Sequence, residues 1–221
     1  MLICRLLVQQ RFPVRVLARD PESARRRLPT EVEIVRGDIT RPATLPTAVA
    51  GVQHIIFTAG CRSGRPASRR KIKLTEFDGV SNTIAAAQSA GFNGRFMYMT
   101  SSGVQSRSFW ARALNVYKGN TLVWRGLAEG LVRSSGLSYT IIRAGMLLNT
   151  AGGRHAIRVA QRLVPLSPRY HIARADVAAV FVAALLHPRA DRATFEIVWQ
   201  HGAAPWPQAL DHLESDAAPR D

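Results

Sequence analysis

The stretch PVRVLARD, residues 13–20, decides how the rest of this chain is interpreted. Small apolar residues at positions 14, 16 and 18 alternate with positions 15 and 17, and Arg19 and Asp20 then end the run. This pattern predicts a short strand followed by a charged turn, and such strand ends in an α/β sheet face bound nucleotides. An arginine there suits the 2′-phosphate of NADP and an acidic residue suits the 2′-hydroxyl of NAD, so Arg19 and Asp20 indicate different ligands. The alternative is that Arg19 only solvates the end of a strand.

Predicted strands and helices alternate along the rest of the chain. Helices are predicted over 2–10, 21–28, 42–50, 75–90, 122–134 and 176–186, the last capped by Asp176. Strands are predicted over 14–18, 32–35, 52–57, 95–100, 139–143 and 195–198. The alternation is typical of parallel βαβ units, so we expect the α/β class, as a Rossmann-like doubly wound parallel sheet. One domain is expected over 1–201, followed by a loose tail over 202–221.

The composition narrows the classes of partner. The formal net charge of +15 favours polyanionic ligands, but basic residues cluster only over 62–73, in a segment without acidic or aromatic residues. Because nucleic-acid surfaces combine charge with stacking rings, we interpret this segment as a solvated loop and disfavour nucleic acid as a partner. A run of about eighteen apolar residues is absent, so no membrane span is predicted. Cys4 and Cys61 lack disulfide or metal-binding spacing, which suits a reducing, cytoplasmic compartment.

Six segments follow one another in a distinctive order. They are VRVLARDPE (14–22), EIVRGDITRP (33–42), EFDGVSNTIAAAQSAGF (76–92), MTSSG (99–103), WRGLAEGLVRSSGLSYTIIRAG (124–145) and ARADVAAVFVAAL (173–185). Together they resemble the atypical short-chain dehydrogenase/reductase family, in its NAD(P)H-binding, NmrA-like group. The resemblance extends over about residues 1–200. It implies a dinucleotide cofactor, with NADP(H) favoured over NAD(H), and a small-molecule substrate of unknown identity.

The resemblance also implies roles for particular residues. Arg19 would face the adenosine 2′-phosphate, Asp38 would accept a hydrogen bond from the adenine amino group, and Ile39 would pack on the adenine ring. The residues implied near the ribose are Thr58, Ala59, Gly60 and Arg125, and those implied near the nicotinamide are Ser101, Ser102, Ala144, Gly145 and Met146, with Ala144 where the family usually has proline. Ser102 is the candidate for donating a proton or polarising the substrate. Asp38 has an alternative role as a turn or helix cap.

Two features depart from the family pattern. The family begins with a strand and a glycine-rich turn that binds the pyrophosphate, and here Met1 falls where the following helix is already under way. We therefore expect an N-terminally truncated sheet without its central first strand, either because the start is incomplete, which leaves an organellar location open, or because the site is lost. The family's Tyr-x-x-x-Lys pair is also absent, with Thr121 and Arg125 at its two places, and an arginine cannot relay a proton.

These observations lead to one main hypothesis and one alternative. The main hypothesis is an NADP(H)-dependent oxidoreductase of the atypical short-chain dehydrogenase/reductase type. The alternative is a non-catalytic redox sensor or scaffold that binds a dinucleotide, which the missing Tyr-x-x-x-Lys pair and the missing phosphate turn favour. Tyr117, beside Lys118, is a further candidate acid, with an exposed loop tyrosine as its alternative interpretation.

Overall fold

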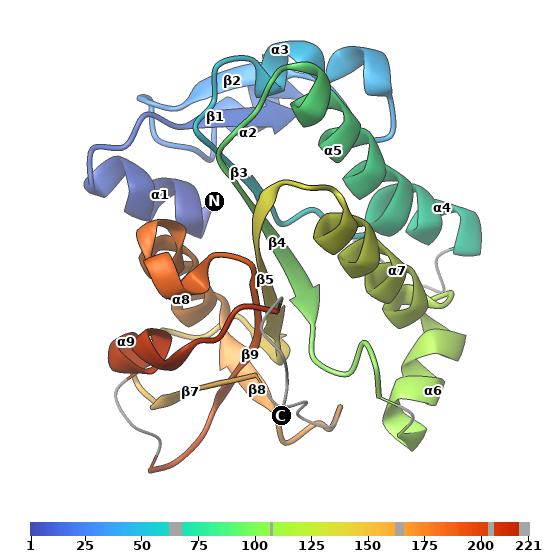
Figure 1. Cartoon of the computed structure of the whole chain (residues 1–221), viewed down its shortest axis with the longest axis vertical. Helices are drawn as coiled ribbons and strands as arrows, with labels where there is room; N and C mark the ends of the chain where they lie inside the picture. Colours follow the sequence, from blue (N-terminus) through green and yellow to red (C-terminus); the bar gives the residue numbers. More distant parts are fainter. Residues whose placement is uncertain (62–67, 107, 162–165, 203–205, 217–221) are drawn as a thin grey trace.

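A five-stranded sheet forms the centre of the computed structural model, which describes residues 1–61, 68–106, 108–161, 166–202 and 206–216. The strand order is β3 (His54–Phe57), β4 (Arg95–Ser101), β5 (Ser138–Ala144), β9 (Ala193–Trp199) and β7 (Ile157–Ala160). The first four run parallel, and β7 pairs with β9 in the antiparallel direction at one edge. The predicted α/β class with a largely parallel sheet is confirmed (Figure 1).

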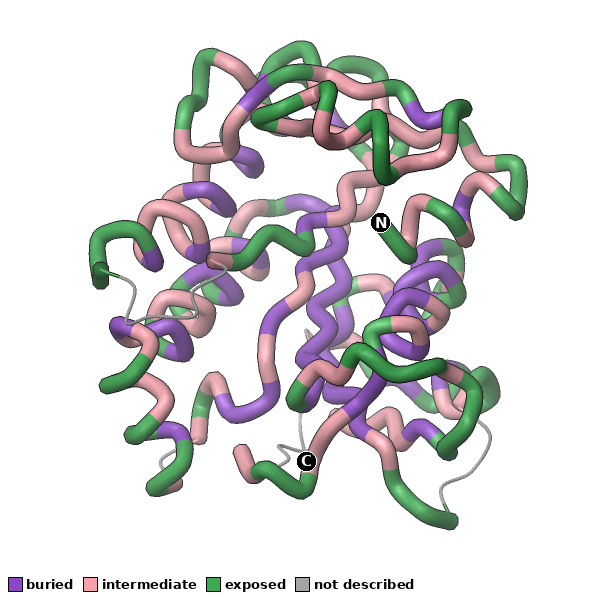
Figure 2. The backbone as a smooth tube through the Cα atoms, turned by 180° about the vertical axis from the view of Figure 1, so that it is seen from behind, coloured by how far each residue is buried: buried purple, intermediate pink, exposed green. Residues whose placement is uncertain are grey.

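Helices cover both faces of this sheet because its strands carry apolar side chains in both directions. On β4, Met97 packs toward α1 (Leu2–Gln9) and α8 (Arg174–Leu186). Its neighbours Phe96 and Tyr98 pack toward α5 (Gly79–Ser89) and α7 (Thr121–Ser134) on the other face. Figure 2 shows the buried residues concentrated in the central strands and on the inward sides of the helices. The sheet is therefore doubly wound, as the alternation of elements predicted.

The strand predicted from PVRVLARD belongs to a second, smaller sheet. β1 (Arg15–Ala18) and β2 (Glu33–Arg36) pair in parallel, and α2 (Pro21–Arg25) connects them. Within the described residues, no hydrogen-bonded ladder joins this pair to β3. The 3-10 turn η1 (Pro42–Thr44) and α3 (Pro46–Val49) then lead the chain to β3.

The helix predicted over 75–90 begins earlier than its apolar pattern indicated. α4 (Arg69–Lys73) follows Ser68, whose side chain accepts a hydrogen bond from the Lys71 amide at 3.3 Å. The π-helical turn η2 (Leu74–Asp78) joins α4 to α5. The interpretation of 62–73 as a solvated loop is therefore wrong for residues 69–73, because the buried Ile72 anchors them as a helix. Residues 62–67 of that segment lie outside the described residues.

Asp176 is buried in the first turn of α8 and does not cap it. The helix begins at Arg174, and the residue before it, Ala173, has no capping side chain. The Asp176 carboxylate accepts hydrogen bonds from the Gly153 amide and the Trp199 indole N–H, each at 2.7 Å. The predicted cap is wrong because long-range partners, which are invisible to local pattern, occupy the carboxylate.

Part of the segment predicted as a loose tail is folded and packs on the core. α9 (Trp206–Ala209) and η4 (Leu210–His212) follow β9, and both Leu210 and Leu213 are buried in the core beside α8. Asp216 accepts a hydrogen bond from the Tyr139 hydroxyl at 3.1 Å. Residues 203–205 and 217–221 lie outside the described residues.

Five further elements were not predicted from the sequence. They are α6 (Phe109–Tyr117), β6 (Met146–Leu148), β7, β8 (His171–Ala173) and η3 (Pro188–Ala190).

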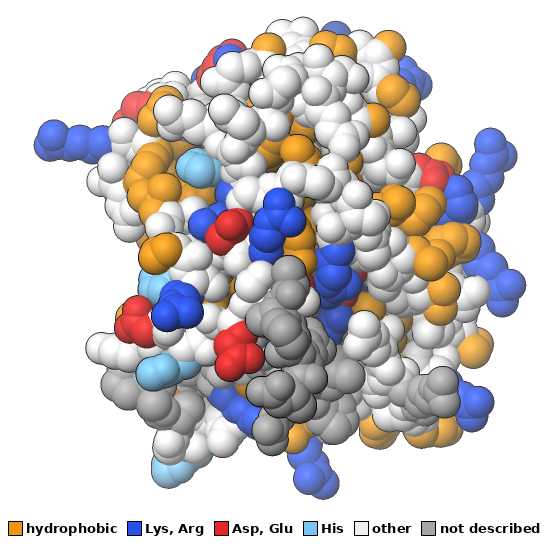
Figure 3. Space-filling model, viewed as in Figure 1, with side chains coloured by type: hydrophobic (Ala, Val, Ile, Leu, Met, Phe, Trp, Pro, Cys, Tyr) orange, Lys and Arg blue, Asp and Glu red, His pale blue; other side chains and the backbone are white. Residues whose placement is uncertain are grey.

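Basic side chains do not gather into a single patch on the face of the molecule shown in Figure 3. Figure 3 shows Lys and Arg side chains spread around the face in view, with acidic side chains among them. Other arginines are buried and paired, as Arg143 is with the buried Glu129 at 2.7 Å. Among the helices described, none is long and apolar enough to cross a membrane.

Candidate functional site

The turn after β1 gives Arg19 and Asp20 different roles. Asp20 is the N-cap of α2, and its Oδ1 accepts a hydrogen bond from the Ser23 amide at 3.0 Å. The first amides of a helix have no intrahelical partner, so an aspartate at this position is stabilising. Arg19 is exposed, and its charge acts on Asp38 at the end of the neighbouring strand β2. Both residues are exposed, but Asp20 has one carboxylate oxygen engaged in the cap, whereas Arg19 has no salt bridge in the described chain.

The turn after β2 holds Asp38 in a fixed orientation. Its Oδ1 accepts hydrogen bonds from the amide and the hydroxyl of Thr40, each at 2.9 Å, so the turn role considered from the sequence is present. Burial acts to raise the pKa of Asp38, but the hydrogen bonds from Thr40 and the charges of Arg19 and Arg41 outweigh it and lower that pKa. Oδ2 has no hydrogen-bond partner within the described chain. It is therefore an acceptor of the kind that an exocyclic amino group needs.

Close packing fixes the residues on either side of Asp38. A Cβ at Gly37 would lie 2.8 Å from the Thr44 carbonyl oxygen, so a larger residue would displace the backbone. The Ile39 side chain lies against the start of α5, where its Cδ1 is 2.8 Å from the position of a Cβ on Gly79. Asn82 Nδ2 donates to the Ile39 carbonyl at 2.9 Å. Ile39 is half-buried in this contact, and its contact with an adenine ring stays a prediction.

The segment after β3 runs exposed past the guanidinium of Arg125. Thr58, Ala59 and Gly60 are all exposed. A Cβ at Gly60 would lie 3.1 Å from Arg125 Nη2, which is closer than most such contacts allow. Glycine at position 60 therefore lets the backbone approach α7. The structure therefore brings residues 58–60 and Arg125, which the resemblance implied for the ribose, close together.

A buried carboxylate, Glu76, holds Arg125 in this position. The Glu76 side chain is 3% exposed, and its Oε1 accepts hydrogen bonds from Arg125 Nη2 at 3.1 Å and from the Cys61 amide at 3.4 Å. Its Oε2 accepts the hydroxyl of Thr121. Burial acts to lower the pKa of Arg125, but the Glu76 charge outweighs it and raises that pKa above its ordinary value. Arg125 is thus a fixed cation rather than a proton donor.

The groups that could replace the missing catalytic tyrosine are engaged, buried or exposed at the end of a helix. Thr121 stands at the place of the family's tyrosine, is 4% exposed and donates its hydroxyl to Glu76. Tyr98 is buried in β4, and that burial raises its pKa far above the ordinary value, so it stays neutral. Tyr117 is 52% exposed at the end of α6. The geometry offers no acid of the Tyr-x-x-x-Lys kind among these residues.

The carboxyl ends of β4 and β5 bring the predicted nicotinamide residues together. Ser101 is in register with Ala144, and the Ser102 amide donates to the Ala144 carbonyl at 2.9 Å. Ser102 is 1% exposed, and its hydroxyl has no hydrogen-bond partner in the described part of the chain. A Cβ at Gly145 would lie 2.8 Å from a neighbouring backbone carbonyl oxygen, whereas Met146 is 48% exposed. These residues form one wall, in which Ser102 is shielded from solvent.

Glu76 is the candidate that the sequence analysis missed. Glu76 lies four residues before Val80 and eight before Ile84, a spacing that places it on their buried helix face. An acidic residue on a buried face needs a charged or hydrogen-bonding partner, which is the signal that could have identified it. Its partners Thr121 and Arg125 lie 45 and 49 residues further along the chain, beyond the reach of local patterns. The π-helical turn that carries Glu76 is a type often found at functional sites.

The residues at these strand ends fit an extended dinucleotide. Arg19 offers a cation and Asp38 offers a carboxylate with a free oxygen. Residues 58–60 offer an exposed backbone segment, and Arg125 beside them offers a second cation. Their roles toward the phosphate, the adenine and the ribose of such a ligand stay predictions. No group of three His, Cys, Asp or Glu residues in the described ranges is placed to hold a metal ion.

Known proteins share much of this sequence. A family model described as NAD(P)H-binding matches residues 1–188. The chain is 33% identical over 172 residues to the uncharacterized sugar epimerase YhfK of Bacillus subtilis (strain 168), an alignment that covers 78% of this chain and 74% of the relative. It is 31% identical over 209 residues to sanguinarine reductase of Eschscholzia californica, covering 79% of this chain and 75% of that protein.

Solved structures share the fold at lower identity. A putative NAD-dependent epimerase/dehydratase from Bacillus halodurans superposes with a TM-score of 0.78 at 22% identity, covering 96% of this chain and 92% of that one. A short-chain dehydrogenase/reductase from Veillonella parvula DSM 2008, solved in complex with NADP, gives a TM-score of 0.68 at 15% identity, covering 89% and 87%. These similarities confirm the Rossmann-like fold.

Proposed function

Because this chain belongs to the NAD(P)H-binding family of atypical short-chain dehydrogenases/reductases, we propose that it is an NADP(H)-dependent oxidoreductase acting on a small molecule. The observation that carries the preference for NADP(H) is the turn after β1. Asp20 is oriented as the cap of α2, with its Oδ1 turned to the Ser23 amide rather than to a ligand. Arg19 is exposed at the same strand end, where its guanidinium suits a 2′-phosphate.

The chain's own residues would bind and orient the cofactor, which supplies the hydride when bound. Asp38 would accept from the adenine amino group through Oδ2. Arg125, fixed by Glu76, would donate to ribose hydroxyls beside Gly60. Ser102 is proposed to polarise the substrate, because its unpartnered hydroxyl keeps both its donor and its acceptor capacity.

A binding comparison between the two dinucleotides tests the NADP(H) preference. NADPH and NADH are titrated separately into the chain and followed by tryptophan fluorescence, and we expect NADPH to bind more tightly. Arg19→Gln should weaken NADPH binding by about tenfold or more, since a hydrogen bond to a charged group contributes about 1.5–3 kcal/mol. NADH binding should change by less than about twofold, because it lacks the phosphate that this charge would meet.

A matched control separates this effect from the general positive charge of the chain. Arg27→Gln removes an exposed arginine that follows α2, and it should leave both dinucleotides unaffected. Equal losses of NADPH and NADH binding in Arg19→Gln, or equal losses of NADPH binding in the two variants, would overturn the assignment of Arg19.

A non-catalytic dinucleotide sensor is the second candidate, and the engagement of Thr121 by Glu76 favours it. Turnover decides between the two functions. Steady oxidation of NADPH in the presence of a quinone, above a control without protein, supports the oxidoreductase. Ser102→Ala should then slow turnover while leaving NADPH binding unchanged, and an unchanged rate would remove Ser102 from the reaction. Saturable NADPH binding with no turnover on quinone, enone or azo acceptors would support the sensor.

A further inference from the structure

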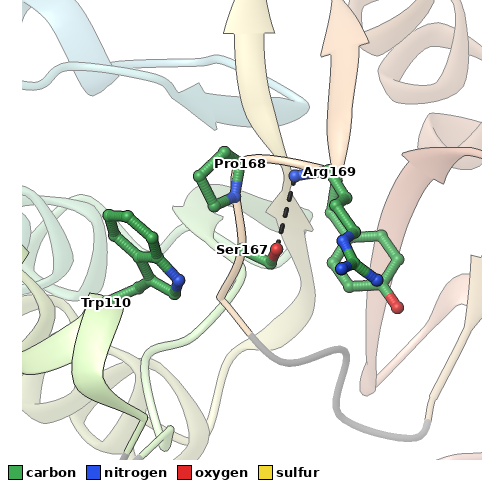
Figure 4. Close-up of a pocket in the computed structure, with 5 residues that line it drawn as sticks. Trp110, Ser167, Pro168 and Arg169 are labelled. Atoms are coloured by element: carbon green, nitrogen blue, oxygen red, sulfur yellow. Dashed lines mark hydrogen bonds between the residues drawn. The ribbon is translucent and has the colours of Figure 1, made fainter.

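A hollow of about 470 Å³ opens beside the nicotinamide end of the candidate site. Its lining consists of Trp110, Ser167, Pro168, Arg169 and Tyr170. Figure 4 shows Trp110 at the start of α6 facing Ser167 and Pro168, with Arg169 further along the same loop. The volume lies within the range of about 300–1,000 Å³ that small-molecule sites occupy.

The loop that lines the hollow is tied to the ends of β4 and β5. Leu166 packs so closely on Gly103 that a Cβ there would lie 2.5 Å from Leu166 Cβ. Gly103 has a φ of +85°, which also favours glycine. The Met146 amide donates to the Tyr170 carbonyl at 2.9 Å. The hollow therefore adjoins the wall at the ends of β4 and β5. It meets that wall at Gly103, next to Ser102, and at Met146.

The lining combines flat apolar surfaces with one unpaired cation. Trp110 is 52% exposed, so its indole is available for stacking. Pro168 and Tyr170 add further apolar surface. Arg169 is exposed, and no carboxylate in the described part of the chain pairs with it. Ser167 Oγ accepts from the Arg169 amide at 3.4 Å, which fixes the loop and leaves the guanidinium free.

We propose that this hollow is the substrate site and that it takes a planar, polycyclic aromatic molecule with an anionic group. Trp110 stacks on the ring system, and Arg169 pairs with the carboxylate or sulfonate. That the bound molecule is a substrate rests on the proposed oxidoreductase function, whereas the preference of the hollow for such a molecule does not depend on it.

Calorimetric titration with two probes of the same ring system tests the proposal. The probes are anthraquinone-2-sulfonate and the uncharged 2-(hydroxymethyl)anthraquinone, each titrated into the full chain with and without saturating NADP⁺. The sulfonate should bind about tenfold more tightly than the neutral probe, which is what one charge-assisted contact contributes. The salt concentration is held near 0.15 M, where charges beyond about 8 Å are largely screened.

Two variants with matched controls identify the contacts. Arg169→Gln should remove the preference for the sulfonate without weakening the neutral probe, while Arg189→Gln, another exposed arginine, should preserve that preference. Trp110→Ala should weaken both probes by about tenfold. Tyr117→Ala removes an aromatic side chain of equal exposure, 52%, from the same helix and should weaken neither.

Each outcome bears on a specific part of the proposal. Equal binding of the two probes, or a preference that survives Arg169→Gln, would overturn the anionic group. Equal effects of Trp110→Ala and Tyr117→Ala would overturn the hollow as the site. Because the titrations are also run without dinucleotide, failure of NADPH binding would overturn the proposed function and leave the probe result to be judged separately.

Discussion

Removing the carboxylate of Glu76 should be the most destabilising single change at the candidate site. The side chain of Glu76 is 3% exposed and that of Arg125 is 18% exposed, so both charges lie largely outside water. Glu76→Ala leaves the guanidinium without its counter-ion and also leaves the Thr121 hydroxyl and the Cys61 amide without their acceptor. An unpaired buried charge is costly because the desolvation penalty remains after the attraction is gone.

The magnitude follows from that burial. Breaking a buried ion pair by removing one partner costs about 3–5 kcal/mol in the free energy of unfolding. For a domain of this size, each kcal/mol lowers Tm by about 2–4 °C, so the expected fall is roughly 6–20 °C. Glu76→Gln keeps an acceptor for Thr121 but removes the charge, and its loss should lie between those of the parent chain and Glu76→Ala.

Urea unfolding of a double-mutant cycle tests this reasoning. Arg125→Ala and the double variant complete the cycle, and the double variant should lose less than the sum of the two single losses by at least about 1.5 kcal/mol. Glu33→Ala serves as the control, because its pair with Arg15 leaves the Glu33 side chain 57% exposed and should cost about 1 kcal/mol or less. Additive losses, or a Glu76→Ala loss no larger than that of Glu33→Ala, would refute the account of the cluster.

Three further predictions concern stability. Gly103→Ala should destabilise the chain by about 1–3 kcal/mol, because φ is +85° and the new Cβ would meet Leu166 at 2.5 Å. Gly130→Ala lies inside α7 with nothing within 4 Å of the new Cβ, so it should instead stabilise the chain by about 0.5–1 kcal/mol. Thermal unfolding measures both variants, and a change of the same sign in both would contradict the packing argument. Burial and the Asp216 carboxylate raise the pKa of Tyr139 from 10.0 to about 12, so its contribution is complete below pH 10 and is lost as the pH rises to 12. Unfolding free energies measured over that window should fall more steeply for the parent chain than for Tyr139→Phe, and parallel curves would contradict the shift.

The sequence by itself determined the elements whose patterns are local. The strand at 14–18, the helix that starts at Pro21 and the alternation of strands with helices depend on neighbouring residues, and each can be identified from side-chain period and from Gly and Pro positions. The sequence missed α6 and the short strands β6, β7 and β8, which lack a strong period. It also misjudged the tail, because Leu210 and Leu213 are fixed by packing on distant helices rather than by a pattern of their own.

The candidate site divides in the same way. Arg19 was predicted because the end of a strand in an α/β sheet faces a bound nucleotide, and the role of Asp38 was implied by the family resemblance. The cap role of Asp20 was not predicted, and the hydrogen bond from the Ser23 amide shows it. The cluster of Glu76 with Arg125 joins residues 49 positions apart on two helices. Tertiary structure alone decided it, because the period of a helix tells which face is buried but not which partner a buried charge will meet.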